Sequence, residues 1–190
     1  KQPLRKEIAE VAQILGMPGA YFLNVNFEWG CTVKAHDTAR GPELVRVLDW
    51  GTPGLGGSVV MLKVASRFGH WYTPSWPGFA GIVHGHAPGR FALAMNQAPL
   101  KSTTGIFTID WSLERERVWN SSGMLPAHLL RRAMEEAASY QDAYAMLCST
   151  PLCAPAIFSI VGINTGEHAI VERTRAGYFE VALAVAANRV

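Results

Sequence analysis

A cysteine at a glycine–cysteine–threonine junction is the residue of this sequence best suited to covalent chemistry. Cys31 follows Gly30, and a basic and an acidic side chain, Arg46 and Asp49, lie a short distance downstream. A thiol attacks a carbonyl group once a base has taken its proton and a nearby cation or dipole stabilises the thiolate. Cleavage of the Gly30–Cys31 bond would give Cys31 an α-amine that can act as this base. The junction therefore predicts a cysteine nucleophile that is formed when the chain is cut in front of it.

The alternative for a cysteine in such a setting is a small buried hydrophobic residue. Cys31 has the apolar neighbours Trp29 and Val33, and this environment is typical of a packed thiol. Cys148 and Cys153 are separated by four residues, a spacing that fits neither a zinc knuckle nor a redox CxxC pair. We interpret these two cysteines as ordinary buried thiols.

Composition limits the classes of function without selecting one. The chain has 190 residues, of which 49% are hydrophobic, which is enough for one sizeable core, so we expect a single domain over residues 1–190. A formal net charge of +2 without a basic cluster argues against a nucleic-acid partner. No run of about 18 apolar residues is present, so no membrane span is expected. Residues 1–6 lack the apolar stretch of a signal peptide, and the cellular compartment stays open.

Hydrophobic periodicity predicts helices at the beginning and the middle of the chain and strands elsewhere. Apolar residues from Ile8 to Leu15 recur at helical spacing, and Gly16 supplies a stop. A second helical region begins at Pro126 and breaks near Ser139. Strand patterns cover 21–29, 44–48, 58–65, 81–86, 91–96, 156–162, 169–172 and 178–187. Strands, helices and then strands again predict an α+β protein with two antiparallel sheets and helices packed outside them.

Several short segments in one order along the chain resemble a known family. They are 7–16, 23–28 with Cys31-Thr32, the Arg-x-x-Asp of 46–49, 78–85, 88–96, 150–162, Glu172-Arg173 and Ala187-Asn188. Together they resemble the acid ceramidase and N-acylethanolamine acid amidase branch of the choloylglycine hydrolase family, which includes penicillin V acylase. These are N-terminal-nucleophile hydrolases. The resemblance implies a four-layer αββα sandwich, with 1–30 as a leading segment, 31–190 as the catalytic segment, and the two cleavage products able to associate.

The resemblance also implies a role for each site residue. Cys31 would be the nucleophile of an autoprocessed amidohydrolase, and its own α-amine would be the base. Asp49 would orient that amine, and Arg46 would favour the thiolate. Asn188 and Asn96 would donate hydrogen bonds to the oxyanion. No cofactor and no metal is expected, because His84 and His86 alternate on one strand without a third ligand at a suitable spacing.

A cluster of aromatic residues between two predicted strands suggests the kind of substrate. The cluster consists of Phe68, Trp71, Tyr72, Trp76 and Phe79. Apolar-lined clefts suit acyl chains, so we expect an N-acyl amide, of the fatty-acyl amide, ceramide or N-acylethanolamine type, as the small-molecule partner. Penicillin V, bile-salt conjugates and acyl-homoserine lactones are alternatives, as is a non-catalytic relative that only binds an acyl ligand or a partner. The same cluster could equally be core. The candidate substrate-binding residues are Trp71, Tyr72, Trp76, Phe79 and His84.

Overall fold

The computed structural model describes residues 4–17, 20–24, 30–49, 53–99, 101–181 and 185–188. Its elements follow the sequence from α1 to β10. They are α1 (Arg5–Leu15), η1 (Ala20–Asn24), β1 (Gly30–Thr38), β2 (Gly41–Asp49), η2 (Leu55–Ser58), β3 (Val60–Ser66), β4 (Gly69–Ser75), β5 (His84–Ala87), β6 (Phe91–Gln97), α2 (Phe107–Asn120), α3 (Pro126–Glu136), α4 (Tyr140–Ser149), β7 (Ala156–Val161), β8 (His168–Arg173), β9 (Tyr178–Glu180) and β10 (Val185–Asn188).

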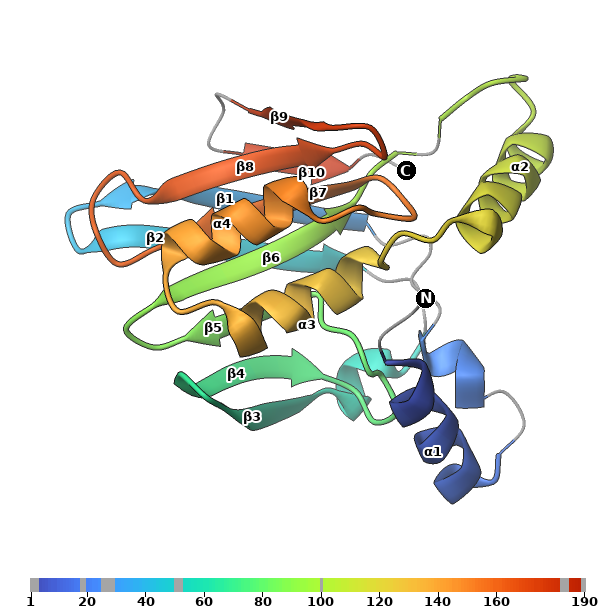
Figure 1. Cartoon of the computed structure of the whole chain (residues 1–190), viewed down its shortest axis with the longest axis horizontal. Helices are drawn as coiled ribbons and strands as arrows, with labels where there is room; N and C mark the ends of the chain where they lie inside the picture. Colours follow the sequence, from blue (N-terminus) through green and yellow to red (C-terminus); the bar gives the residue numbers. More distant parts are fainter. Residues whose placement is uncertain are drawn as a thin grey trace.

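The strands form two antiparallel sheets. The small sheet has the order β10-β1-β2, and the large sheet has the order β3-β4-β5-β6-β7-β8-β9. Helices α3 and α4 lie across one face of the large sheet, and β1 and β2 lie behind its other face (Figure 1). This arrangement confirms the predicted α+β class with two antiparallel sheets.

Strand β6 shows how the sequence builds the two layers. Phe91, Leu93 and Met95 point toward the helices and join the main core, whereas Ala94 packs against Val33 of the small sheet. The two sets alternate because successive side chains of a strand point to opposite faces. Strand β7 is buried at every position, as expected for a strand covered on both sides.

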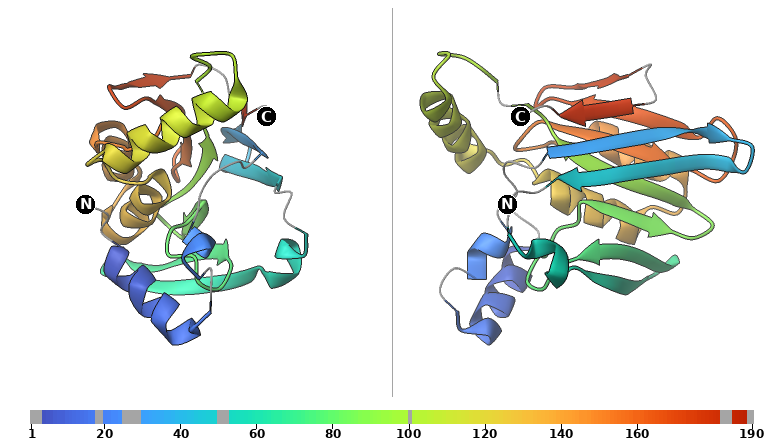
Figure 2. Two further views of the ribbon diagram at one scale, coloured as in Figure 1. Left: turned by 90° about the vertical axis from the view of Figure 1, so that its right-hand side faces the viewer. Right: turned by 180° about the vertical axis from the view of Figure 1, so that it is seen from behind.

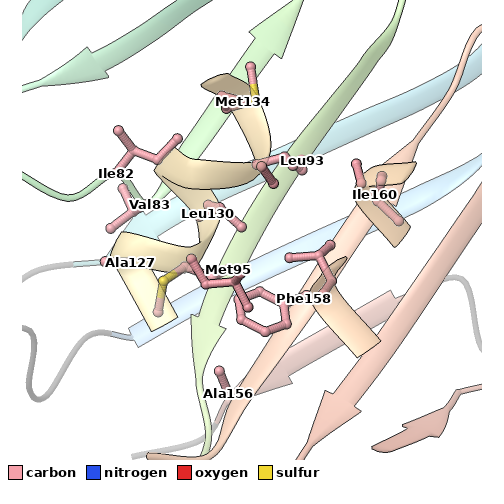
Figure 3. Close-up of a cluster of buried hydrophobic side chains, with 14 of the residues drawn as sticks. Ile82, Val83, Leu93, Met95, Ala127, Leu130, Met134, Ala156, Phe158 and Ile160 are labelled. Carbon is pink, nitrogen blue, oxygen red and sulfur yellow. The ribbon is translucent and has the colours of Figure 1, made fainter. Parts of the chain in front are cut away.

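The core between α3 and the large sheet is closely packed. Leu130 and Met134 of α3 lie over Leu93 and Met95 of β6 (Figure 3). Gly85 of β5 allows this close approach, because a Cβ atom at this position would lie 3.0 Å from the Met134 side chain, which would have to shift. The close approach brings α3 directly onto β5, which also carries a candidate site residue, His84.

Helices α1 and α2 lie at the same end of the molecule, opposite the turn that joins β1 to β2 (Figure 2). Strand β1 begins at this end. The outer face of the small sheet exposes Val45, Val47 and Val185. Among the described residues, the helices that lie across a sheet are α3 and α4, and both lie on the large sheet.

Two predictions of local structure need correction, and three of the α-helices and strands were not predicted. Residues 20–24 form a 3-10 helix instead of the start of a strand, and 25–29 lie outside the described residues. The predicted strand 178–187 is two strands, β9 in the large sheet and β10 in the small one. The three that were not predicted are helix α2 and strands β1 and β4. Among the described residues, no helix is long and apolar enough to cross a bilayer.

Candidate active site

Cys31 lies at the start of β1, on the face that packs against the large sheet. Its side chain is 2% exposed, and Val33 and Ala35 on the same face are also buried. The register pairs Cys31 with Leu48 of β2 on one side and with Asn188 of β10 on the other. Because β1 is the central strand of the small sheet, Cys31 is held by a neighbouring strand on each side.

Arg46 is the charged side chain in contact with the thiol. It faces inward from β2, opposite Val33. Its Nη2 donates to Cys31 Sγ at 2.9 Å and to the carbonyl oxygen of Met95 at 2.9 Å. Its Nη1 lies 3.4 Å from Nδ1 of His84. The guanidinium group thus joins the small sheet to β5 and β6 of the large one.

Burial and charge act in opposite directions on the thiol. Burial raises the pKa of Cys31 above its ordinary value, and the nearby Asp49 carboxylate raises it further. The positive charge and the hydrogen bond of Arg46 lower the pKa, and their effect is smaller than that of burial. Burial also lowers the pKa of Arg46. In the uncut chain, the thiol is therefore kept in its neutral form at neutral pH.

The remaining candidate catalytic residues surround the Cys31 backbone. Asp49 pairs with Gly30 across β1 and β2, so it lies opposite the residue before Cys31, and its own side chain is exposed. Asn96 is fully buried, and its Nδ2 donates to the carbonyl oxygen of Cys31 at 3.3 Å. The Cα atom of Asn188 is opposite that of Cys31, and its side chain lies outside what the structure describes.

A pocket of about 580 Å³ begins beside this cluster, between β2 and the face of the large sheet formed by β4 and β5. Leu44, Met61 and Pro74 give it apolar walls, and His84 and Tyr72 also line it. Among the five residues expected to bind substrate, these last two are the ones at the pocket.

The other three aromatic candidates belong to the hydrophobic core. Trp71 is 1% exposed and lies on the opposite face of β4 from Tyr72. Trp76 and Phe79 stack on each other, with ring centroids 4.5 Å apart. Their burial in the main core is consistent with the packing role that their sequence pattern left open.

Two contributors to the site carry no sequence signal. The carbonyl oxygen of Met95 holds Arg46, but a backbone group has no side-chain signature. Thr73 Oγ1 donates to the carbonyl oxygen of His84 at 2.7 Å, from a strand that the sequence did not reveal. Both depend on the pairing of strands in the large sheet.

Residues within 1–30 contact residues within 31–190 at the loop before β5 and at α3. Asn24 Nδ2 donates to the carbonyl oxygen of Gly78 at 2.9 Å, and Ala80 N donates to Asn24 Oδ1 at 2.8 Å. Glu7 of α1 forms an ion pair with Arg131 of α3 at 2.6 Å, and Arg131 also donates to the carbonyl oxygen of Ala80. The first three of these contacts join residues 1–30 to residues 31–190, and we call these three contacts the clasp.

The two facing antiparallel sheets have the arrangement of an N-terminal-nucleophile hydrolase fold. A solved structure supports this fold: the Caenorhabditis elegans N-acylethanolamine-hydrolyzing acid amidase (NAAA) ortholog superposes with a TM-score of 0.66 at 15% identity, covering 83% of this chain and 69% of the other. At that identity the likeness concerns the fold alone.

Sequence comparison identifies the chain as similar to acid ceramidase. It is 30% identical to the Homo sapiens protein over 101 residues and 29% identical to the Heterocephalus glaber protein over 102 residues. These matches cover 53% of this chain but only 24% of each relative. No family model matches the sequence. The resemblance predicted from the motifs is thus confirmed, for a chain that spans about a quarter of the relatives' length.

Proposed function

We propose that this chain is an autoprocessed cysteine amidohydrolase that cleaves the linear C–N amide bond of an N-acyl amide. The observation that supports it most is the 2.9 Å contact between Arg46 Nη2 and the buried Sγ of Cys31. A guanidinium group on a thiol is the electrostatic partner that a thiolate nucleophile requires. The similarity to acid ceramidase and to an acid amidase supports the same class of reaction.

The first reaction of the proposed cycle is processing. Cys31 Sγ attacks the carbonyl carbon of Gly30, the Gly30–Cys31 C–N bond breaks, and the proton of the thiol passes to the released nitrogen. Water then hydrolyses the thioester, giving a carboxylate on Gly30 and a free α-amine on Cys31. Asp49 is paired with Gly30, so a carboxylate-bearing residue lies opposite the bond that is cut.

Amide hydrolysis follows by the same chemistry. The α-amine of Cys31 accepts the thiol proton, the thiolate attacks the substrate carbonyl, and the amine returns the proton to the leaving nitrogen. The resulting thioester is hydrolysed by water. Asp49 orients the α-amine, Arg46 stabilises the thiolate, and Asn96 and Asn188 donate to the oxyanion. The location of Asn96 beside Cys31, with its amide nitrogen 3.3 Å from the Cys31 carbonyl oxygen, supports this role.

The pocket beside the cluster supports an apolar acyl group in the substrate. It begins at His84, which contacts Arg46, and it continues between the apolar side chains Leu44, Met61 and Pro74. A volume of about 580 Å³ is in the range of sites for small organic ligands. The relatives are named for hydrolysis of ceramide and of N-acylethanolamines, so long-chain fatty-acyl amides are the first substrates to try.

A trapping experiment tests this proposal. The processed protein is mixed with an N-acylethanolamine or a ceramide, released amine is measured, and protein mass is followed for an acyl adduct that hydroxylamine removes. We expect turnover and an adduct on Cys31, both abolished by Cys31→Ala and both retained by Cys148→Ala, which removes a thiol outside the site. Turnover that survives Cys31→Ala would overturn the proposal, and so would the absence of turnover and adduct with both substrates.

A further inference from the structure

His84 contacts Arg46 from the opposite sheet. The Nη2 atom of Arg46 is held by Cys31 Sγ and by the Met95 carbonyl oxygen, and the Nη1 atom approaches His84 Nδ1 at 3.4 Å. The three groups come from β1, β6 and β5. The orientation of the guanidinium plane is therefore set by a contact on each of its terminal nitrogens.

The chemistry of the two side chains fixes the direction of this contact. A guanidinium group has donors only, so Nδ1 of His84 must be the acceptor and the ring proton must sit on Nε2. Burial and the charge of Arg46 lower the pKa of His84 to about 4, which keeps the imidazole neutral and able to accept at neutral pH.

His84 is itself held in place. Thr73 Oγ1 donates to its carbonyl oxygen, and its backbone pairs with Ala94 of β6. On the same face of the large sheet, Tyr72 of β4 and His86 of β5 are the neighbouring titratable side chains, and they pair with each other. The charged groups on the β2 side are Arg46 beside the ring and, at the far part of the pocket, Arg40 and Glu43, which form an ion pair at 2.8 Å.

We propose that His84 is a positioning residue, which accepts a hydrogen bond from Arg46 and so holds the guanidinium group against the Cys31 thiol. The inference rests on the proposed function, because it assumes that Arg46 acts on that thiol. His84 also lines the pocket, so loss of its acceptor would leave Nη1 facing the pocket and free the guanidinium group to turn away from Sγ. The thiolate would then lose the cation that stabilises it.

Two variants separate the acceptor from the bulk of the side chain. His84→Asn keeps a short side chain that can place an oxygen acceptor near the position of Nδ1, and His84→Leu fills similar space without an acceptor. Each protein is alkylated with iodoacetamide over a range of pH, and the modified Cys31 peptide is quantified by mass spectrometry. Alkylation of Cys153 in the same samples is the reference for intact packing, because this thiol is buried away from the site.

The midpoint of the pH–rate curve for Cys31 is the informative quantity. We expect His84→Leu to move it upward by about one unit, a roughly tenfold loss of rate at a fixed pH below the midpoint, and His84→Asn to stay within about twofold of the parent protein. A looser structure would raise the rate at every pH and at Cys153 without moving the midpoint. The same midpoint in all three proteins would overturn the inference.

Nitrogen NMR of the imidazole gives a second, independent reading. We expect the Nε2–H tautomer of His84 in the parent protein and a change in its Nδ1 resonance in Arg46→Gln. A protonated Nδ1 at neutral pH would contradict the inference. Neither measurement needs substrate, so the two proposals can fail separately. A chain that fails to hydrolyse amides refutes the proposed function. An unchanged midpoint of the pH–rate curve for Cys31 and an Nδ1–H tautomer refute the role of His84.

Discussion

Arg46 and Cys31 approach each other from adjacent strands of the small sheet, with Arg46 Nη2 2.9 Å from Cys31 Sγ. They are two positions apart in the antiparallel register, because Arg46 pairs with Val33 and Leu48 pairs with Cys31. Alternate residues of a strand share a face, so both side chains point into the space between the two sheets. One hairpin thus brings a cation to a buried thiol, which burial alone would keep protonated.

Removal of this cation should slow the reactions of the thiol. We predict that Arg46→Gln raises the pKa of Cys31 further, because an adjacent opposite charge shifts a pKa by about one to three units. The rate at which the Cys31 thiol reacts at neutral pH should therefore fall by about tenfold to a thousandfold. Arg46→Lys should restore part of the rate. The control is Arg132→Gln, since the Arg132 side chain is 44% exposed on α3, lies outside the pocket and forms an i,i+4 ion pair with Glu136. Equal rates for Arg46→Gln and the control would contradict this role.

Asp49 should matter for turnover and hardly at all for stability. Asp49→Asn is expected to reduce kcat sharply, since it removes the charge that orients the α-amine of Cys31. The side chain is exposed, so the free energy of unfolding should change by less than about 0.5 kcal/mol. Kinetics and thermal unfolding of the same sample check both parts. Near-normal activity would refute the assigned role.

The clasp should keep the leading segment attached after cleavage. The double variant Glu7→Gln, Asn24→Ala removes the ion pair to Arg131 and the hydrogen bonds to the loop before β5. We predict that the released 1–30 fragment then separates on gel filtration, whereas it co-elutes with 31–190 in the parent protein. Glu10→Gln is the matched control, because Glu10 pairs with Lys6 within α1 itself. A fragment that dissociates equally from all three proteins would show that the clasp does not hold it.

Acid should destabilise the fold through a buried histidine. His128 is 1% exposed, and neither ring nitrogen has a hydrogen-bond partner among the described residues. Burial and then the Arg131 charge lower its pKa to about 4, while Glu7 acts in the opposite direction. Between about pH 6.5 and 4 the unfolded chain binds a proton that the folded chain does not, so the free energy of unfolding falls as the pH falls. The loss approaches about 3 kcal/mol below pH 4.

The variant His128→Leu checks this dependence by urea unfolding at several pH values. We expect it to lose about 2 to 3 kcal/mol less than the parent protein between neutral pH and pH 4, because no proton can bind at this position. His70→Leu, at an exposed position of β4, should leave the parent slope unchanged. The same slope in His128→Leu and the parent protein would rule out His128 as the source.

Cys31, Arg46 and Asp49 were predicted from the Gly-Cys-Thr junction and from the family resemblance, whereas strand β1 of the hairpin that carries them was not predicted. The contact between Arg46 and His84 spans 38 residues and depends on how the two sheets pack, which no local pattern encodes. For the same reason His84 was expected at the substrate and not at Arg46.

The side-chain pattern of the sequence did not predict helix α2 or the division of 178–187 into two strands. Helix α2 was missed because its apolar residues, such as Phe107, Ile109 and Trp119, do not form one buried stripe and are instead exposed. The run 178–187 read as one strand because its apolar residues are continuous, although β9 and β10 belong to different sheets. Helix α1 was predicted well because its periodicity and the left-handed Gly16 at its end are both local features.

The most direct test of the account is the intact mass of the chain after incubation at acidic and at neutral pH. We predict that the parent protein yields two products separated at the Gly30–Cys31 bond and that Cys31→Ala stays whole, while Cys148→Ala is cut like the parent. A parent chain that remains uncut under all conditions, or a Cys31→Ala chain that is cut at the same bond, would contradict the claim that Cys31 is a self-generated N-terminal nucleophile.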